Sequence, residues 1–209
     1  MQDNVTVLGA GIVGICTALS LAERGVTVEV IDRGPPGRET SYGNAGIISP
    51  WSVIPQSLPG TWRQIPNLMF GQYGPLAAKV SAWPRLSPWG IRFLRNGTEE
   101  KVRKTSDAME FLCGPSIELY RRHLMGTNAD HLVADAMYVH AFRDGSRASL
   151  SSLDYDIRRQ KGADLELIGQ DELQRLEPAI SGDFKAAVLI KGQARATSPG
   201  RICDALAAK

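Results

Sequence analysis

Residues 5–32 read VTVLGAGIVGICTALSLAERGVTVEVID, and this stretch decides the fold class of the chain. The β-branched run at 5–8 predicts a buried parallel strand, and the apolar residues that follow recur at helical spacing. Gly25 is typical of the position just after a helix, and residues 26–31 predict a second strand that ends at Asp32. Because parallel strands need a crossover, this order predicts the strand–helix–strand unit of a nucleotide-binding α/β domain.

Three glycines in the spacing G-x-G-x-x-G join the first strand to the helix. Gly9 allows the tight turn, Gly11 lets a pyrophosphate approach the backbone, and Gly14 lets the helix pack closely on the strand. The helix N-terminus then offers free N–H groups and a positive dipole end to the phosphates. The alternative is a glycine-rich turn that binds nothing. The dinucleotide-binding residues predicted from this unit are Val7, Leu8, Gly9, Ala10, Gly11, Ile12, Val13, Gly14, Asp32 and Arg33.

Asp32 bears on the choice of dinucleotide. A carboxylate at the tip of the second strand is placed to accept hydrogen bonds from ribose hydroxyls. An acid there favours a free 2′-hydroxyl, hence FAD or NAD over NADP. Arg33 follows directly and weakens the distinction between NAD and NADP.

Composition indicates an ordinary soluble globular protein, with 43% hydrophobic and 22% charged residues in 209. The net charge of +2 argues against a nucleic-acid partner. The three cysteines and three histidines have no ligand spacing, so we expect no metal site, no disulfide framework and a reducing, cytoplasmic compartment. Residues 1–4 contain no Lys or Arg, which is the wrong flank for a signal sequence, and we expect no membrane-spanning helix.

Residues 39–50, ETSYGNAGIISP, are dense in small and hydrogen-bonding side chains. They suit either a solvent loop or a segment that lies against a flat ring or a phosphate. Together with the nucleotide-binding unit, the pattern T-S-x-G-N-A-G-x-I-S-P at 40–50 resembles the FAD-dependent amine and amino-acid oxidoreductases. Within these the chain is most similar to bacterial D-amino-acid dehydrogenases and glycine (D-amino acid) oxidases. The L-x-x-L-E-P pattern at 173–178 agrees with that resemblance.

The resemblance implies FAD as cofactor and oxidative deamination of a D-amino acid to a 2-oxo acid and ammonia. In the family, the segment that matches 41–48 runs past the pyrophosphate and under the flavin. It implies cofactor contacts from Ser41, Asn44, Ala45, Gly46 and Ile48. The family commonly has glutamate where this chain has Asp32, which keeps the same acceptor chemistry. No catalytic residue is predicted, since the family's substrate-binding arginine would lie beyond the sequence in hand.

Residues 51–97 hold all four tryptophans, and no Asp or Glu occurs from 40 to 98. Prolines divide this stretch, and short helices are predicted at 61–70 and 89–95. One interpretation is a helical cap packed with aromatic residues. The other is a basic, aromatic face at a membrane surface or near a lipophilic electron acceptor. The resemblance favours the second, because such dehydrogenases pass electrons to membrane quinones, and it implies peripheral contact at the inner face of the plasma membrane.

The rest of the chain predicts an inserted helical and mixed-sheet domain. A long helix at 98–125 should break at Gly114–Pro115, and the remaining elements are expected as helices at 149–160, 169–178 and 197–209 and strands at 136–142, 163–168 and 186–190. The predicted fold class is α/β (α+β). Its parts are a Rossmann-type FAD-binding portion at 1–50, a cap and substrate domain at 51–195, and a helix at 196–209 that returns to the first portion.

A third parallel strand should follow that last helix, because two strands do not complete a doubly wound sheet. We therefore expect the chain to be the N-terminal half of a longer oxidoreductase, inactive by itself. Two alternatives remain at this point. One is a NAD-dependent dehydrogenase, which has no need for the segment at 40–50. The other is a non-catalytic fragment that retains a dinucleotide site.

Overall fold

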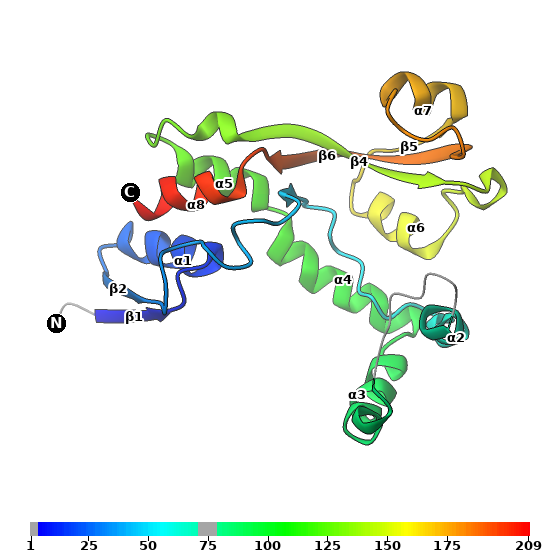
Figure 1. Cartoon of the computed structure of the whole chain (residues 1–209), viewed down its shortest axis with the longest axis horizontal. Helices are drawn as coiled ribbons and strands as arrows, with labels where there is room; N and C mark the ends of the chain where they lie inside the picture. Colours follow the sequence, from blue (N-terminus) through cyan, green and yellow to red (C-terminus); the bar gives the residue numbers. More distant parts are fainter. Residues whose placement is uncertain (1–3, 71–78) are drawn as a thin grey trace.

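The structure is a computed structural model that describes residues 4–70 and 79–209; Pro75 of the tryptophan-rich stretch lies outside them. Figure 1 shows an elongated molecule, with β1, β2, α1 and α8 at one end and α6 and α7 at the other. The described elements are β1 (Asn4–Leu8), α1 (Ile12–Ala22), β2 (Thr27–Ile31), β3 (Ile47–Ile48), α2 (Thr61–Phe70), η1 (Val80–Ala82), α3 (Trp83–Arg95), α4 (Glu99–Cys113), α5 (Ser116–Leu124), η2 (Asp130–Leu132), β4 (Val133–Phe142), η3 (Gly145–Arg147), α6 (Leu153–Gln160), β5 (Leu165–Gly169), α7 (Gln170–Leu176), β6 (Ala186–Ala196) and α8 (Pro199–Ala207).

The first sheet is the strand–helix–strand unit that the sequence predicts. β1 pairs in parallel with β2, from Asn4 opposite Thr27 to Leu8 opposite Ile31. The helix α1 connects the two strands. The chain turns from this helix toward β2 at Gly25, whose φ of +80° is a left-handed conformation that glycine adopts without a steric penalty. The predicted fold class, a Rossmann-type unit combined with a mixed helix and sheet region, is confirmed.

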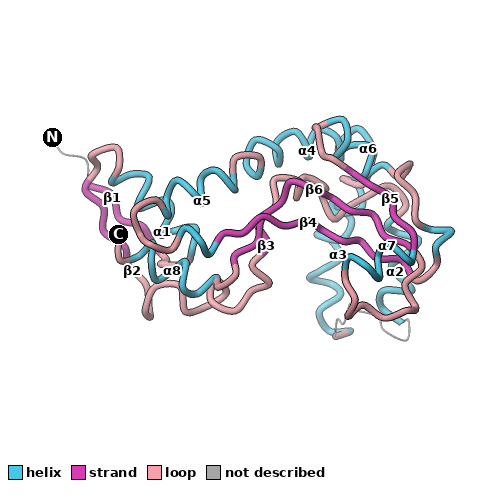
Figure 2. The backbone as a smooth tube through the Cα atoms, turned by 90° about the horizontal axis from the view of Figure 1, so that it is seen from above, coloured by secondary structure: helices cyan, strands magenta, loops and turns pink. Residues whose placement is uncertain are grey.

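The second sheet is antiparallel and is built around β6. One edge of β6 pairs with β4 along its length, while β5 and then β3 pair with the other edge. A register shift between Ala136 and Tyr138 interrupts the β4 ladder. Figure 2 shows β4 and β6 running along the molecule, with α4 and α5 in line beside them. The long β6 strand thereby connects the region around β3 with the region around β5.

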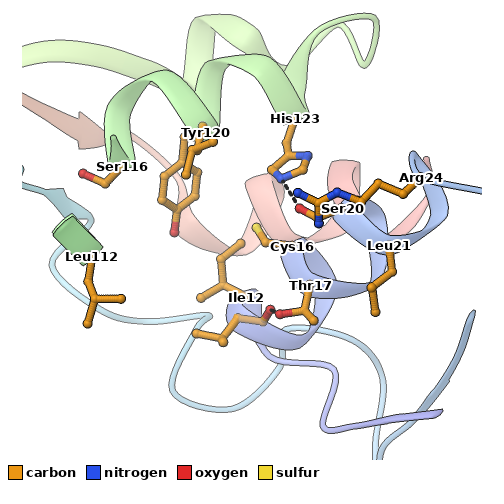
Figure 3. Close-up of a pocket in the computed structure, with 12 residues that line it drawn as sticks. Ile12, Cys16, Thr17, Ser20, Leu21, Arg24, Leu112, Ser116, Tyr120 and His123 are labelled. Atoms are coloured by element: carbon orange, nitrogen blue, oxygen red, sulfur yellow. Dashed lines mark hydrogen bonds between the residues drawn. The ribbon is translucent and has the colours of Figure 1, made fainter. Parts of the chain in front are cut away.

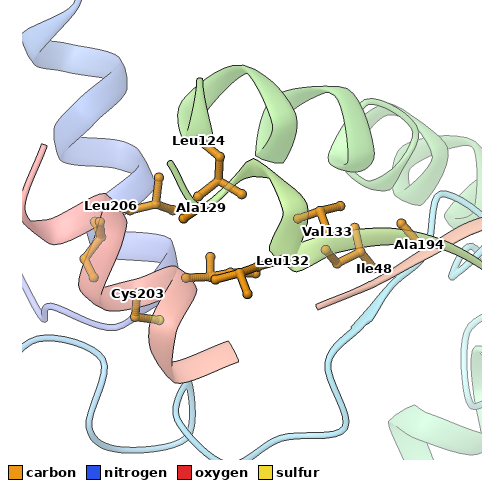
Figure 4. Close-up of a cluster of buried hydrophobic side chains, with 10 residues drawn as sticks. Ile48, Leu124, Ala129, Leu132, Val133, Ala194, Cys203 and Leu206 are labelled. Carbon is orange, nitrogen blue, oxygen red and sulfur yellow. The ribbon is translucent and has the colours of Figure 1, made fainter. Parts of the chain in front are cut away.

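The main hydrophobic core lies where α1, α5 and α8 meet the end of the second sheet. Figure 4 shows how side chains from separate parts of the chain converge there, among them Ile48 of β3, Leu124 of α5, Val133 of β4 and Leu206 of α8. Each of these side chains is at most 7% exposed. One core therefore contains residues from all three ranges into which the sequence was divided. This packing holds β3 beside the first turn of α1.

Several element bounds differ from the sequence-based expectation. The helix expected at 98–125 is two helices, and the predicted break at Gly114–Pro115 is confirmed. α3 starts at Trp83 rather than at 89, because Pro84 is tolerated in a first helical turn. β6 extends to Ala196 and β3 was not predicted; both result from pairing with distant strands. Within the described residues, every helix is too short or too polar to cross a membrane.

Candidate dinucleotide-binding site

Two of the three glycines in the turn between β1 and α1 cannot be replaced without strain, Gly9 because of its backbone conformation and Gly14 because of its lack of space. Gly9 has φ +106°, which other residues adopt only with strain, and its N–H donates to the Ile31 oxygen at 2.7 Å. A Cβ atom on Gly14 would lie 1.9 Å from the carbonyl oxygen of Gly9. The helix therefore packs against the turn at a distance that any side chain at position 14 would prevent.

Gly11 differs from Gly9 and Gly14 because neither its backbone conformation nor a close backbone contact requires glycine. It precedes α1 in an extended conformation, φ −71° and ψ 174°, which any residue can adopt. A Cβ atom on Gly11 would contact Ser41 Oγ at 3.3 Å and would otherwise enter open space. The backbone conformation does not require glycine at this position. What glycine provides here is the absence of a side chain, which leaves space in front of the helix N-terminus.

The N-terminus of α1 is open to an anion on one side and capped on the other. Ser41 Oγ accepts a hydrogen bond from the Ile12 N–H at 3.0 Å. Val13, in the same turn, is 77% exposed. The first N–H groups of a helix have no partner inside it, so the first turn still offers donors and a positive dipole end to a phosphate.

Asp32 is fixed just after β2 by backbone N–H groups of the β1–α1 turn and of the loop that follows β2. Its Oδ2 accepts from the Ala10 N–H at 2.6 Å, and its Oδ1 accepts from the Gly34 N–H at 3.0 Å. These two N–H groups hold the pKa of the Asp32 carboxyl below its usual range, so it is ionised at neutral pH. A carboxylate has about four acceptor positions, which leaves capacity for ribose hydroxyls. Arg33 instead pairs with Glu39 at 2.8 Å on the surface.

The segment at 41–48 is attached to β6 by its backbone. Gly46 accepts a hydrogen bond at its oxygen from the Ala196 N–H at 2.6 Å. It has φ +69°, and a Cβ atom there would lie 2.3 Å from the Ala196 oxygen. The Asn44 side chain closes its own loop, accepting from the Gly46 N–H at 2.7 Å and donating to the carbonyl oxygens of Thr40 and Ser41. Its amide therefore shapes the segment, and a cofactor contact would compete with these bonds.

The structure brings the two predicted sets of residues together at the N-terminus of α1. A cavity of about 40 Å³ there is lined from both sets, by Ile12, Ser41, Asn44, Gly46 and Ile48. Leu8, beside the turn, is 80% exposed, and Ala45 is exposed as well. Val7 is half-buried, with its Cγ1 3.4 Å from where a Cβ on Gly14 would lie, and Ala10 is buried. The two predicted sets thus meet at this cavity, and Leu8 and Val13 leave the neighbouring side of the turn exposed.

Three residues that support this site were not identified from the sequence. Tyr120 of α5 and Cys203 of α8 line the same small cavity, and burial raises the pKa of Tyr120 to about 12. Gly37 donates its N–H to the Ala10 oxygen at 2.8 Å, and a Cβ on it would lie 2.3 Å from Cys203 Cβ. In the sequence, the Gly-Pro-Pro run at 34–36 indicates a loop, but nothing in it shows what that loop contacts.

A second, larger cavity of about 480 Å³ runs between α1 and α5. Figure 3 shows Cys16 and Ser20 of α1, with Arg24 just after this helix, facing Tyr120 and His123 of α5 across it. The Ser20 hydroxyl and His123 Nε2 are 3.2 Å apart, which ties the two helices together. Burial raises the pKa of Cys16 to about 11, so this side chain is a neutral thiol at physiological pH.

The comparisons with known proteins agree with this geometry. The family described as FAD dependent oxidoreductase matches residues 4–209. A D-amino-acid oxidase from Bradyrhizobium diazoefficiens is 34% identical, over 98% of this chain and 49% of that protein. D-amino acid dehydrogenase 2 from Ralstonia nicotianae is 31% identical, over 88% of this chain and 44% of that protein. The chain thus spans about half the length of the curated relatives it matches.

Solved structures show the same fold. A glycine oxidase from Bacillus cereus superposes with a TM-score of 0.56 at 16% identity, over all of this chain and 43% of that one. An L-amino acid deaminase from Proteus vulgaris gives 0.59 at 19% identity, over 99% of this chain and 37% of that one. The turn that only glycine fits, the open helix N-terminus and the ionised Asp32 are the features that the dinucleotide part of FAD requires. The chain belongs to the family of FAD-dependent oxidoreductases.

Proposed function

We propose that the chain forms the FAD-binding half of an enzyme that oxidises D-amino acids to 2-oxo acids and ammonia. The observation that supports it most is the contact between Ser41 and Ile12, because it holds the segment at 41–48 at the phosphate-binding end of α1. A NAD-dependent enzyme has no need for a segment at that place. The two curated relatives, whose names state oxidation of D-amino acids, favour this substrate class.

When bound, FAD would accept the two electrons released as the amino acid becomes an imino acid, which water hydrolyses to the 2-oxo acid and ammonia. The residues of this chain bind and orient. The first-turn N–H groups of α1 would receive the pyrophosphate, and Asp32 would accept hydrogen bonds from the ribose. Backbone groups at 45–48 would lie along the ring. We assign no catalytic residue.

The partners that we propose are an amino-acid substrate, a quinone or other electron acceptor, and a membrane surface contacted peripherally. The location proposed with them is the cytoplasm, at the inner face of the plasma membrane. We also propose the division into an FAD-binding portion at 1–50, a cap and substrate domain at 51–195 and a return helix at 196–209. The core shared by α1, β3, β4 and α8 means that these portions would fold together.

The site is tested by separating binding from folding at Gly11. A Gly11→Val substitution adds carbon atoms in front of the helix N-terminus, where the backbone itself accepts any residue. We expect FAD binding, followed by flavin fluorescence, to fall at least tenfold in the variant. Circular dichroism should stay that of the parent chain. Gly34→Ala is the matched control, since a Cβ there meets nothing within 4 Å and FAD binding should be unchanged. A folded Gly11→Val protein that binds FAD as well as the parent would refute the assignment.

The main alternative is a non-catalytic protein that retains a dinucleotide site. It is supported by the finding that this chain covers less than half the length of the two relatives. Measuring turnover of a panel of D-amino acids with an artificial electron acceptor and excess FAD tests whether the 209 residues are sufficient for catalysis. We expect the 209 residues alone to give no turnover near the ordinary enzyme range of roughly 1 per second or more. Turnover at that rate would show that the chain is catalytically sufficient.

A further inference from the structure

The edge of β6 that carries two strands has a gap between them. β5 pairs with residues 186–190 of β6, and β3 pairs with Ala194 and Arg195. Among the residues that the structure describes, neither of these two ladders includes Lys191. The backbone of β6 is irregular there, since Gly192 has φ +68°, a conformation that favours glycine. The Lys191 carbonyl oxygen lacks a ladder partner, and a donor of another kind, such as a side chain, has to satisfy it.

Trp51 supplies that donor with its side chain. Its indole Nε1–H donates to the Lys191 oxygen at 2.9 Å, across 140 positions of the chain. The Trp51 carbonyl oxygen accepts from Arg158 Nε at 3.3 Å. The indole also packs against buried side chains of α6 and β6. Trp51 is thus attached to β6 by its side chain and to α6 by its backbone.

The segment at 46–51 follows β6 in a single register. Gly46 accepts from the Ala196 N–H, and Ile48 lies opposite Ala194. Each step forward along the segment is therefore one step back along β6. Three further steps lead from Ile48 to position 51 and from Ala194 to position 191, which is the pair that the indole joins. The proline at position 50 has no N–H to donate, so a side chain rather than the backbone makes the last bond.

The two paired residues of β3 do not define this register by themselves. Both are isoleucine, and Ile48 enters the main core at 5% exposure while Ile47 is 49% exposed. A slip of one residue would exchange the two, because adjacent side chains of a strand point to opposite faces. Burial of an isoleucine is therefore the same in both registers. Gly46 fixes one end of the segment, since a Cβ atom there would lie 2.3 Å from the Ala196 oxygen, and Trp51 holds the other end.

We infer that Trp51 is a positioning residue for the flavin ring, because its indole bond fixes the register of the segment at 45–48 on β6. The inference rests on the proposed function, in which backbone groups of this segment lie along the ring. A slipped segment would present different N–H and carbonyl groups to the ring, since the bonding direction of the backbone alternates along an antiparallel strand. Binding of the pyrophosphate would not change, because it takes place at the first turn of α1, where Ser41 bonds to Ile12.

The test compares the binding of FAD with that of ADP, which has the pyrophosphate and a ribose but no flavin ring, on the 209-residue chain. Trp51→Phe keeps an aromatic ring and removes the indole N–H. We expect its affinity for FAD, measured by flavin fluorescence, to fall about three- to tenfold, as for the loss of one hydrogen bond. Its affinity for ADP, measured by isothermal titration calorimetry, should equal that of the parent. Gly11→Val should instead lower both affinities, because it blocks the helix N-terminus.

A second measurement needs no ligand. The Ala196 N–H donates to the Gly46 oxygen at 2.6 Å, so its hydrogen exchange, followed by NMR, reports how often the segment leaves β6. We expect this exchange to be about three- to tenfold faster in Trp51→Phe than in the parent. Trp62→Phe is the matched control, because Trp62 of α2 is 59% exposed. It should change neither the exchange rate nor the two affinities, and circular dichroism should show every variant folded.

The inference would be overturned if Trp51→Phe lost affinity for FAD and ADP equally, or if either its FAD affinity or its Ala196 exchange rate stayed at the parent value. The same losses in Trp62→Phe would also overturn it. A parent chain that binds FAD no more tightly than ADP would contradict the proposed function, since the segment would then contribute nothing to binding of the ring. The role of Trp51 toward FAD would fall with it, whereas faster Ala196 exchange in Trp51→Phe would still show that the indole fixes the register.

Discussion

Replacing Gly14 by alanine tests the close packing of α1 on the turn that precedes it. The added Cβ would lie 1.9 Å from the Gly9 oxygen, whereas such contacts essentially never fall below 3.0 Å. The helix or the turn must therefore shift by about 1 Å or more. Neither can shift freely. The Gly9 N–H donates a hydrogen bond to the Ile31 oxygen, and the α1 residue Ile15 is buried in the main core.

The magnitude follows from the rigidity of the clashing atom. Overpacking of a side chain typically costs about 1–3 kcal/mol, and a backbone carbonyl cannot rotate away as a side chain would. We therefore expect the free energy of unfolding to fall by about 3 kcal/mol. For a chain of this size that corresponds to a decrease in Tm of roughly 6–12 °C. The change would be measured by thermal unfolding followed by circular dichroism and by the urea midpoint.

The control is Gly34→Ala in the same unit. A Cβ on Gly34 meets nothing within 4 Å, and alanine retains the N–H that donates to Asp32. Its effect on stability should stay within about 0.5 kcal/mol, as for other substitutions away from tight contacts. If Gly14→Ala unfolds at the same temperature and urea concentration as the parent, the close approach of α1 to the turn is not a property of the folded chain.

Three further predictions concern the pH dependence, the thiols and the core. The pKa of Asp32 is lowered in the folded state, so the carboxylate stabilises the fold above the unfolded pKa of about 4, and this stabilisation is lost as the pH falls through the folded pKa. The urea midpoint should therefore fall less between neutral and acidic pH in the Asp32→Asn variant than in the parent chain. Burial raises the pKa of Cys16 to about 11, so its alkylation by iodoacetamide, followed by mass spectrometry, should still be accelerating at pH 10; a plateau near pH 9 would contradict this. Leu124→Ala should lower the free energy of unfolding by about 2–5 kcal/mol, because this side chain is fully buried. By contrast, Met125→Ala, at a side chain that is 65% exposed, should change the free energy of unfolding by less than about 0.5 kcal/mol.

Local features of the sequence were sufficient to predict the elements that short-range forces determine. The strand–helix–strand unit follows from β-branched residues, glycine spacing and the acid at 32, all of which act within a few residues of one another. The bounds of α2 at 61–70 and the break at Gly114–Pro115 were predicted for the same reason. The resemblance carried by residues 40–50 added the family, which the comparison over residues 4–209 supports.

Only the tertiary structure decided how the segment at 41–48 is held and where it lies. β3 is two residues long, and its pairing with Ala194 and Arg195 depends on a strand about 150 positions away in the chain. Gly46 must be glycine because Ala196 approaches it, and Ser41 caps α1 because the loop folds back onto the turn. No local pattern encodes such contacts, since the partners are set by the packing of α1, α5 and α8 in one core. The sequence by itself predicted which residues would bind a dinucleotide, and long-range packing brings the two predicted sets together at the N-terminus of α1.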